Sequence, residues 1–285
     1  MKLNGLKVTV MLCVSLIVSA CGNQEEVVKT SEPISQVEIK VGFGPSNYAD
    51  QFKEAIQPIL ERKGYKVTPI VFSQNPMITS SMRDNEIDAS ISQSYAFMLD
   101  LNRLLNMDMM SIGHTATAPQ SLRSTKHQSL DEVEDGMLIS LSSDSINMER
   151  GARILESLGW VKINDNAKPA TFSLKDIEKG QYDLRFIEVD PAQSMRSMDD
   201  VDFAVVNGNY VVNMGQKITD GLYVEKTPDE HRVIVTIQSK DKDQQWAKDL
   251  AAAYASDEFR DYILSKSMYE GFIMPKEWNP VSKTK

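Results

Sequence analysis

Strand-like and helix-like segments alternate along the chain from residue 37 to residue 266. In the first pair, residues 37–42 alternate apolar and polar side chains, and residues 48–63 space their apolar side chains at helical intervals. Alternation over this length favours an α/β fold in which mostly parallel sheets are flanked by helices. The pattern restarts after residues 116–119, so we predict two lobes joined by two crossovers.

The spacing of apolar residues predicts the individual elements. Strands are expected at residues 37–42, 65–72, 87–92, 109–115, 137–141, 185–189, 202–206 and 232–238. Helices are expected at residues 48–63, 77–84, 95–105, 147–158, 241–255 and 256–266. Pro58 should kink the first helix and Gly64 should end it, and Ser256 should cap the last helix.

The start of the chain has the pattern of an export signal. A basic segment precedes an apolar run over residues 8–18, which is about half of the ~20 residues that a membrane-spanning helix needs. The run ends in Val18-Ser19-Ala20-Cys21, which resembles a bacterial lipobox, where the cysteine receives lipid. We therefore predict a signal peptide over residues 1–20 and lipidation of Cys21.

The residues that follow Cys21 are mostly polar and suit a flexible tether over residues 21–36. Such a protein would be anchored to a membrane of the cell envelope and would face the periplasm or the cell exterior. The alternative is an ordinary signal peptide that contains a cysteine by chance.

The mature chain is acidic. The formal net charge of the whole chain is −9, and it becomes −11 without the two lysines of residues 1–20. This charge disfavours binding to nucleic acid or to anionic lipid through the overall field. The other cysteine, Cys13, lies in the signal, so we expect no disulfide in the mature body.

No residue pattern indicates a metal, a cofactor or catalysis. The histidines His114, His127 and His231 lack metal-ligand spacing. We find no nucleophile motif, and the acidic residues at 199–202 lie in a solvated loop before a predicted strand. We therefore predict a protein without a cofactor that is not an enzyme.

Several short sequence segments, taken together in their order and spacing, resemble the NlpA lipoprotein family, the methionine-binding lipoproteins of ABC importers. These segments are Val41–Pro45, Glu86–Ala89, Ser129–Asp131, Asn147 with Arg150, Ala192–Gln193, Asp199–Asp202 and Val206–Tyr210. The resemblance runs from Val37 to about Pro275. It implies a type II periplasmic-binding-protein fold that closes on a small-molecule ligand and docks to an ABC permease with its ATPase.

The resemblance also implies how the lobes and the ligand are arranged. Residues 37–117 and 229–285 would form lobe 1, and residues 118–228 would form lobe 2. Arg150 matches the family's carboxylate-binding arginine, and a guanidinium suits a carboxylate because it can bind both oxygens. Asn207 matches an amide that binds the ligand's polar end, and Asn147 matches an asparagine beside the arginine.

Each of these three residues also has a plain structural interpretation. Arg150 could pair at the surface with Glu149 or Glu156. Asn207 could be a turn residue, and Asn147 could be the N-cap of its helix.

The residues that surround the ligand's side chain in that family differ here. The family's aromatic residues and histidine fall on Asn75, Ser92, Ser94 and Phe97. A further family asparagine falls on Val233, and Tyr95, with Tyr48 and Tyr210, is a candidate replacement aromatic residue. We therefore expect an amino acid ligand that is methionine or, because the wall is rich in serine, a more polar amino-acid-like carboxylate.

Two other functions stay open. The turn at residues 42–47 precedes a helix and could cradle a phosphonate- or sulfonate-like anion with its backbone N–H groups. A lipoprotein that kept the fold but has no transport role is the other alternative.

Overall fold

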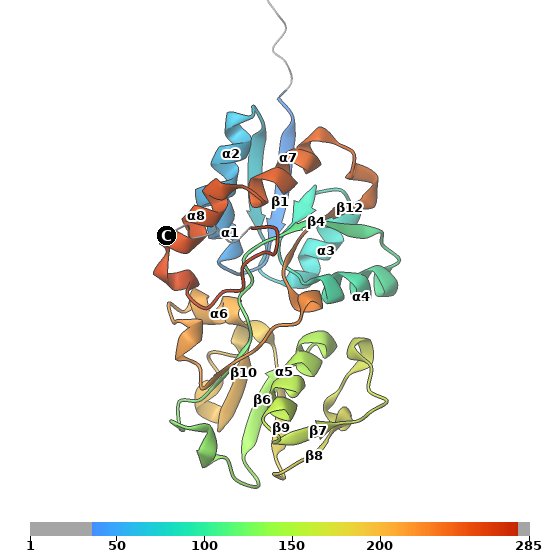
Figure 1. The fold of residues 1–285 in the computed structure, drawn as a ribbon. Coiled ribbons are helices and arrows are strands. Elements are labelled where there is room, and N and C mark those ends of the chain that lie inside the picture. Colours follow the sequence, from blue (N-terminus) through green and yellow to red (C-terminus); the bar gives the residue numbers. More distant parts are fainter. Residues whose placement is uncertain (1–35, 279–285) are drawn as a thin grey trace, which may run out of the picture. The chain divides into compact units, whose positions relative to one another are not determined.

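Two five-stranded sheets organise residues 36–278, which are the residues that the computed structural model describes (Figure 1). The predicted signal peptide, Cys21 and the tether up to residue 35 lie outside the described residues. The prediction of a two-lobed α/β fold with flanking helices is confirmed. Each sheet is mixed, with two parallel and two antiparallel pairings, so parallel pairing is less prevalent than the alternating pattern predicted.

The first sheet has the strand order β2-β1-β3-β12-β4. Its strands are β1 (Glu38–Phe43), β2 (Lys66–Val71), β3 (Ala89–Ser90), β4 (Met109–His114) and β12 (Ile234–Gln238). β2 and β3 pair with β1 in parallel, whereas β12 is antiparallel to both β3 and β4. Because β12 comes late in the sequence, the chain leaves this sheet after β4 and returns to it.

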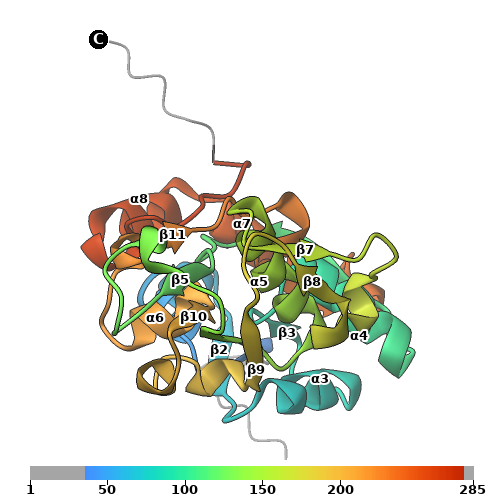
Figure 2. The ribbon, with the colours of Figure 1, turned by 90° about the horizontal axis from the view of Figure 1, so that it is seen from below.

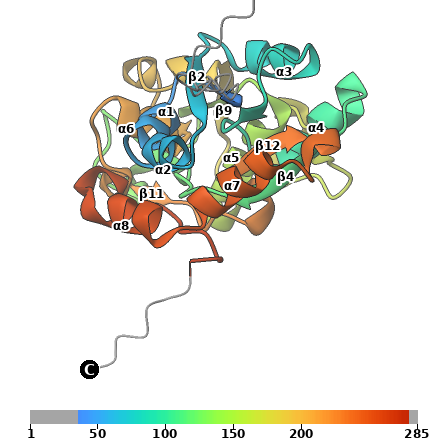
Figure 3. The same ribbon diagram turned by 90° about the horizontal axis from the view of Figure 1, so that it is seen from above.

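Helices cover both faces of the first sheet (Figure 3). α3 (Asn75–Arg83) and α4 (Tyr95–Leu105) lie on one face, where Met82 and Met98 join a buried cluster with Ile234. α1 (Tyr48–Gln51), α2 (Gln57–Arg62), α7 (Gln245–Tyr254) and α8 (Asp257–Ser265) pack on the other face, against Ile39 and Val41. In β1 itself the apolar residues Ile39, Val41 and Phe43 are buried, whereas Glu38 and Lys40 are exposed, as the alternating pattern predicted.

The predicted helix at residues 48–63 forms with a π-helical turn in its middle. The turn spans Phe52–Ile56, and the N–H of Gln57 donates to the carbonyl of Phe52, five residues earlier. Pro58 follows directly, and it can neither donate to the carbonyl four residues before it nor fit against it. The disturbance expected from Pro58 therefore takes the form of a π turn, and Gly64 follows the helix with a φ of +92°.

The second sheet has the strand order β11-β5-β10-β6-β9. Its strands are β5 (Ser121–Arg123), β6 (Leu138–Ser142), β9 (Arg185–Val189), β10 (Phe203–Val206) and β11 (Tyr223–Val224). Successive residues of β10 point to opposite faces of the sheet, which are covered by different helices (Figure 2). Phe203 packs in the cluster with α5 (Ser145–Ser157), and Val206 packs in the cluster with α6 (Gly208–Asn213). A small hairpin, β7 (Val161–Ile163) with β8 (Ile177–Lys179), follows α5.

Two crossover segments, residues 115–120 and 225–233, connect the sheets and run beside each other. The N–H of Thr115 donates to the carbonyl of Val233 at 3.1 Å, and the N–H of Glu225 donates to the carbonyl of Gln120 at 2.9 Å. The two segments are therefore joined by hydrogen bonds at both ends. Within residues 36–278, no helix is long and apolar enough to cross a membrane.

Replacing Gly208 by alanine should disturb the first crossover segment. An added Cβ would lie 2.3 Å from the carbonyl oxygen of Pro119 and 2.9 Å from the Cβ of Ala118. Because one of these atoms is backbone, we expect the free energy of unfolding to fall by about 1–3 kcal/mol, measured by urea denaturation. Gly113→Ala is the matched control, because its added Cβ meets nothing within 4 Å. Equal losses in the two variants would contradict the steric explanation.

Candidate functional site

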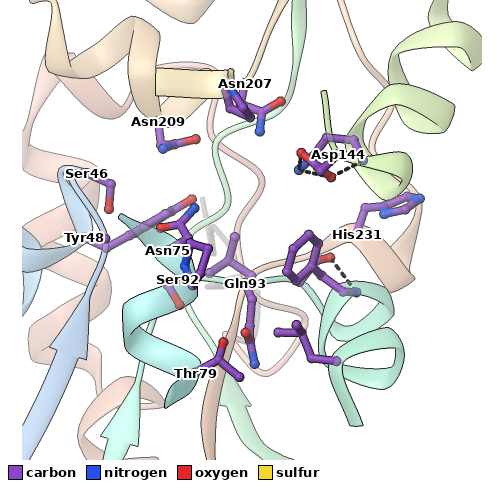
Figure 4. A pocket seen from close by; sticks show the side chains of 18 of the residues that line it. Ser46, Tyr48, Asn75, Thr79, Ser92, Gln93, Asp144, Asn207, Asn209 and His231 are labelled. Atoms are coloured by element: carbon purple, nitrogen blue, oxygen red, sulfur yellow. Dashed lines mark hydrogen bonds between the residues drawn. The ribbon is translucent and has the colours of Figure 1, made fainter. Parts of the chain in front are cut away.

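A cavity of about 400 Å³ lies between elements of the two sheets (Figure 4). This volume lies within the range of about 300–1,000 Å³ that is usual for small-molecule sites. Side chains from the first-sheet part of the fold include Ser46, Tyr48, Asn75, Thr79, Ser92, Gln93 and Phe97. Those from the second-sheet part include Asp144, Asn147, Arg150, Asn207, Asn209 and Tyr210, and the return crossover adds His231 and Val233.

The structure brings together seven of the eight ligand-binding residues proposed from the sequence. Those that line the cavity are Asn75, Ser92, Ser94, Phe97, Asn147, Arg150 and Asn207. Tyr95 does not line it, and 43% of its surface is exposed. The local reason is that Ser94 caps α4 by accepting the N–H of Phe97, so the residue after the cap points away from the cavity.

Arg150 is held by a carboxylate of the same chain. Its Nε donates to Oε1 of Glu225 at 2.6 Å and its Nη2 donates to Oε2 at 2.5 Å, and both side chains are buried. The alternative surface pairing of Arg150 with Glu149 or Glu156 is wrong, because both of those carboxylates bind Arg153 instead. Sequence reasoning missed Glu225 altogether.

Glu225 fixes both the orientation and the charge state of this pair. Burial raises its pKa, but the positive charge and the hydrogen bonds of Arg150, with those from Thr227 and from the Gln120 amide, outweigh burial and hold the pKa below its usual value. The carboxylate is therefore ionised and accepts the side of the guanidinium that carries Nε. Among residues 36–278, Nη1 of Arg150 has no hydrogen-bond partner, so its outer edge can still bind a ligand carboxylate end-on.

Asp144 is a second charged group of the cavity, and it caps α5. It accepts the backbone N–H of Asn147 at 2.8 Å and its side-chain amide at 3.0 Å. Asn147 is therefore not the N-cap but a residue that orients the N-cap. Asp144 lies at the cap position three residues before Asn147, a spacing that could have identified it in the sequence.

Asn207 connects the cavity to the first crossover segment. Its Oδ1 accepts Nε2 of Gln120 at 2.7 Å, and it precedes α6 without a side-chain capping bond. The side-chain amide is therefore positioned by Gln120, and its own N–H donors are left for other partners.

The interior of the cavity carries one uncompensated negative charge. Arg150 is neutralised by Glu225, which leaves the carboxylate of Asp144. Arg83 also lines the cavity, but its side chain is 52% exposed and pairs with Asp84 at 3.1 Å. One cationic edge and one surplus carboxylate in the same cavity suit a ligand that carries both an anionic and a cationic group.

The rest of the wall divides into a polar part and an apolar part. Polar side chains come mainly from α3 and from the residues after β3: Asn75, Thr79, Ser80, Ser92 and Gln93. Apolar side chains come mainly from one face of α4: Phe97, Leu101 and Leu105, with Pro76 and Val233. Such a wall can take a ligand whose side chain has both aliphatic carbon and hydrogen-bonding groups.

The turn at residues 42–47 uses one of its backbone N–H groups internally, and its Ser46 carbonyl accepts from α1. The N–H of Ser46 donates to the carbonyl of Gly44 at 2.8 Å, and the N–H of Ala49 donates to the carbonyl of Ser46 at 3.4 Å. An added Cβ at Gly44 would lie 2.2 Å from Oδ1 of Asn75, so the turn packs directly against this side chain. Within residues 36–278, no cluster of three or more metal-ligating side chains is found.

Known proteins resemble the chain over most of its length. A family model described as NlpA lipoprotein matches residues 39–277. The D-methionine-binding lipoprotein MetQ of Salmonella typhi is 27% identical over 261 residues, which cover 90% of this chain and 92% of that protein.

Two solved structures share the fold. A periplasmic substrate-binding protein of an ABC transporter from Coxiella burnetii has a TM-score of 0.75 and 27% identity, covering 83% of this chain and 99% of that one. A nutrient binding protein from Burkholderia cenocepacia bound to methionine has a TM-score of 0.78 and 25% identity, covering 84% of this chain and 99% of that one.

Proposed function

Because the chain belongs to the NlpA lipoprotein family, we propose that it is the substrate-binding lipoprotein of an ABC importer and not an enzyme. It captures an amino acid, either methionine or a more polar amino-acid-like carboxylate, and delivers it to a permease that is driven by an ATPase. Lipid on Cys21 anchors it in the cell envelope, after removal of a signal peptide over residues 1–20.

The observation that carries this proposal is the arrangement of Arg150 and Asp144. Glu225 occupies one side of the Arg150 guanidinium and leaves its outer edge for the ligand carboxylate. Asp144 supplies the negative charge for the ligand ammonium. The wall built from α3 and α4 then receives the side chain.

We also propose that the two sheets belong to two lobes that close on the ligand. Lobe 1 comprises residues 37–117 and 229–285, and lobe 2 comprises residues 118–228. Lining residues come from both lobes, so a bound amino acid contacts both, and only such a ligand can favour the closed state. Residues 21–36 would be the tether to the membrane.

Two observations weigh against a phosphonate- or sulfonate-like anion as the ligand. The surplus negative charge of Asp144 repels a ligand that lacks an ammonium group. In the turn at residues 42–47, the N–H of Ser46 already donates to the carbonyl of Gly44. A lipoprotein without a transport role would differ from an importer component in uptake assays, because its deletion would leave amino acid import unchanged.

Calorimetric titration of the purified protein, refolded to remove bound ligand, tests the proposal. We expect L-methionine or another amino acid to bind, and Asp144→Asn to weaken that binding by about ten- to a hundredfold, because a charge-assisted hydrogen bond contributes about 1.5–3 kcal/mol. Asparagine keeps the capping function, so the fold should be retained.

The control ligand is 4-methylthiobutanoate, which has the side chain and the carboxylate of methionine but no ammonium. Asp144→Asn should not weaken its binding, because Asp144 serves the ammonium. Equal losses for both ligands would contradict the assignment of Asp144, and binding of simple sulfonates in place of amino acids would contradict the proposed function.

A further inference from the structure

His231 is a buried side chain of the cavity that the proposed binding arrangement leaves unused. It ends a short 3₁₀ turn, Asp229–His231, in the return crossover segment. Only 7% of its surface is exposed, and it lines the cavity on the same side as Asp144 in the view of Figure 4, across from Tyr48. Neither ring nitrogen makes a hydrogen bond within the part of the chain that the structure describes.

Each of the other two histidines of the chain has a carboxylate beside its Nδ1. Nδ1 of His114 lies 2.6 Å from Oε1 of Glu277. Nδ1 of His127 lies 3.1 Å from Oε2 of Glu132, and its ring stacks on Phe203 with 4.9 Å between centroids. His231 is the most buried of the three and lacks such a partner, so its ring is not explained by internal packing alone.

The two ring nitrogens of His231 differ in what can reach them. Nδ1 is enclosed and has no partner, whereas Nε2 is not enclosed. A buried N–H without an acceptor is rarer in proteins than a buried acceptor without a donor. The proton of the neutral ring therefore belongs on Nε2, which makes Nε2 a hydrogen-bond donor with a free N–H.

The surroundings of His231 keep the ring neutral. Burial lowers its pKa, and the nearby charge of Arg150 lowers it further, against the opposing effect of the carboxylates of Glu225, Glu149 and Glu230. Because the charge of Arg150 lowers the pKa of His231, the two side chains are near enough for their charges to interact. A carboxylate bound to the outer edge of Arg150 would thus lie within the field of both groups.

We propose that His231 is a further ligand-binding residue, whose Nε2–H donates a hydrogen bond to the ligand carboxylate beside Arg150. This inference rests on the proposed function, since it concerns the same bound amino acid. His231 would supply a neutral hydrogen-bond donor from the return crossover segment, in addition to the positively charged edge of Arg150. The ligand carboxylate would then connect α5 of the second-sheet part to the crossover that leads back to the first sheet.

Matched substitutions separate a donor at Nε2 from a role in packing. The amide of glutamine reaches the position of Nε2, whereas that of asparagine reaches only the position of Nδ1. We expect His231→Gln to bind the best amino acid of the standard panel within about threefold of the unmodified protein. His231→Asn and His231→Leu should each weaken it about tenfold or more, as measured by calorimetry on the purified full-length protein.

The nitrogen-15 and proton spectrum of the three histidine rings gives an independent readout. Saturation with the same amino acid should shift the Nε2 resonance of His231, identified by its loss in His231→Leu, and leave His114 and His127 in place. Binding with an unmoved His231 signal, or equal affinities for all three variants, would overturn the inference and leave the proposed function standing. An unmodified protein that binds no amino acid would overturn the proposed function, and the inference with it.

Discussion

Replacing Arg150 by methionine should abolish amino acid binding and lower the free energy of unfolding by about 3–5 kcal/mol. The side chains of Arg150 and Glu225 are only 8% and 6% exposed, so the substitution leaves a buried carboxylate without its counter-charge. Removing one partner of such a pair is costly because the other charge has already lost its hydration. Urea denaturation measures the loss of stability, and calorimetry with the amino acid panel measures the loss of binding.

Two controls separate the structural and the binding roles of Arg150. The double variant Arg150→Met with Glu225→Met should recover part of the lost stability, because no lone charge remains, but it should still fail to bind. Arg62→Met removes an arginine whose side chain is 58% exposed and whose partner, Glu258, is 54% exposed, and it should cost less than about 1 kcal/mol. Normal binding by Arg150→Met would show that the arginine acts only as a buried cross-link.

The regular elements could be predicted because their signals are local. α4 forms over the predicted residues 95–105, since Ser94 caps its start and Asn106 ends it in the left-handed conformation with a φ of +49°. α8 follows its predicted cap, Ser256, which accepts the N–H of Phe259 at 3.2 Å. Capping and helical periodicity act within a few residues, so a single sequence contains them.

The short strands could not be predicted for the same reason. β5 has three residues and β11 has two, which is too few for an alternating pattern to be recognised. Their pairing with each other and with β10 is antiparallel and accounts for the mixed second sheet. Such strands form because neighbouring strands offer hydrogen bonds, which is information that the segment itself does not contain.

The candidate site shows the same division. Most of its proposed residues came from the resemblance to a family, and the cavity gathers all of them except Tyr95 and Cys21, the latter outside the described residues. Glu225 is 75 positions from Arg150 in the sequence, and nothing local distinguishes it among 40 acidic residues. Glu225 pairs with Arg150 because the return crossover segment passes beside α5, and this arrangement exists only in the folded chain.

An amino acid with a hydrogen-bonding side chain should bind at least about tenfold more tightly than L-methionine. Asn75 and Ser92 stand where the resembling family has aromatic residues, and each lost sulfur–aromatic contact removes about 0.3–1.5 kcal/mol, where about 1.4 kcal/mol equals a factor of ten. The buried hydroxyl of Ser46 and the amide of Gln93 favour a ligand that can hydrogen-bond. Calorimetry with the standard amino acids measures the ratio directly.

A reciprocal substitution tests whether Ser92 carries this selectivity. Ser92→Phe should tighten methionine binding and weaken that of the polar amino acid, because it restores an aromatic surface and removes a hydroxyl from the cavity wall. Ser94 does not serve for this test, since its hydroxyl caps α4 and its loss would disturb the helix. Equal loss for both ligands would place Ser92 away from the ligand's side chain. Methionine binding tighter than that of every polar amino acid would mean instead that the apolar face of α4, with Phe97 and Leu101, forms the thioether pocket alone.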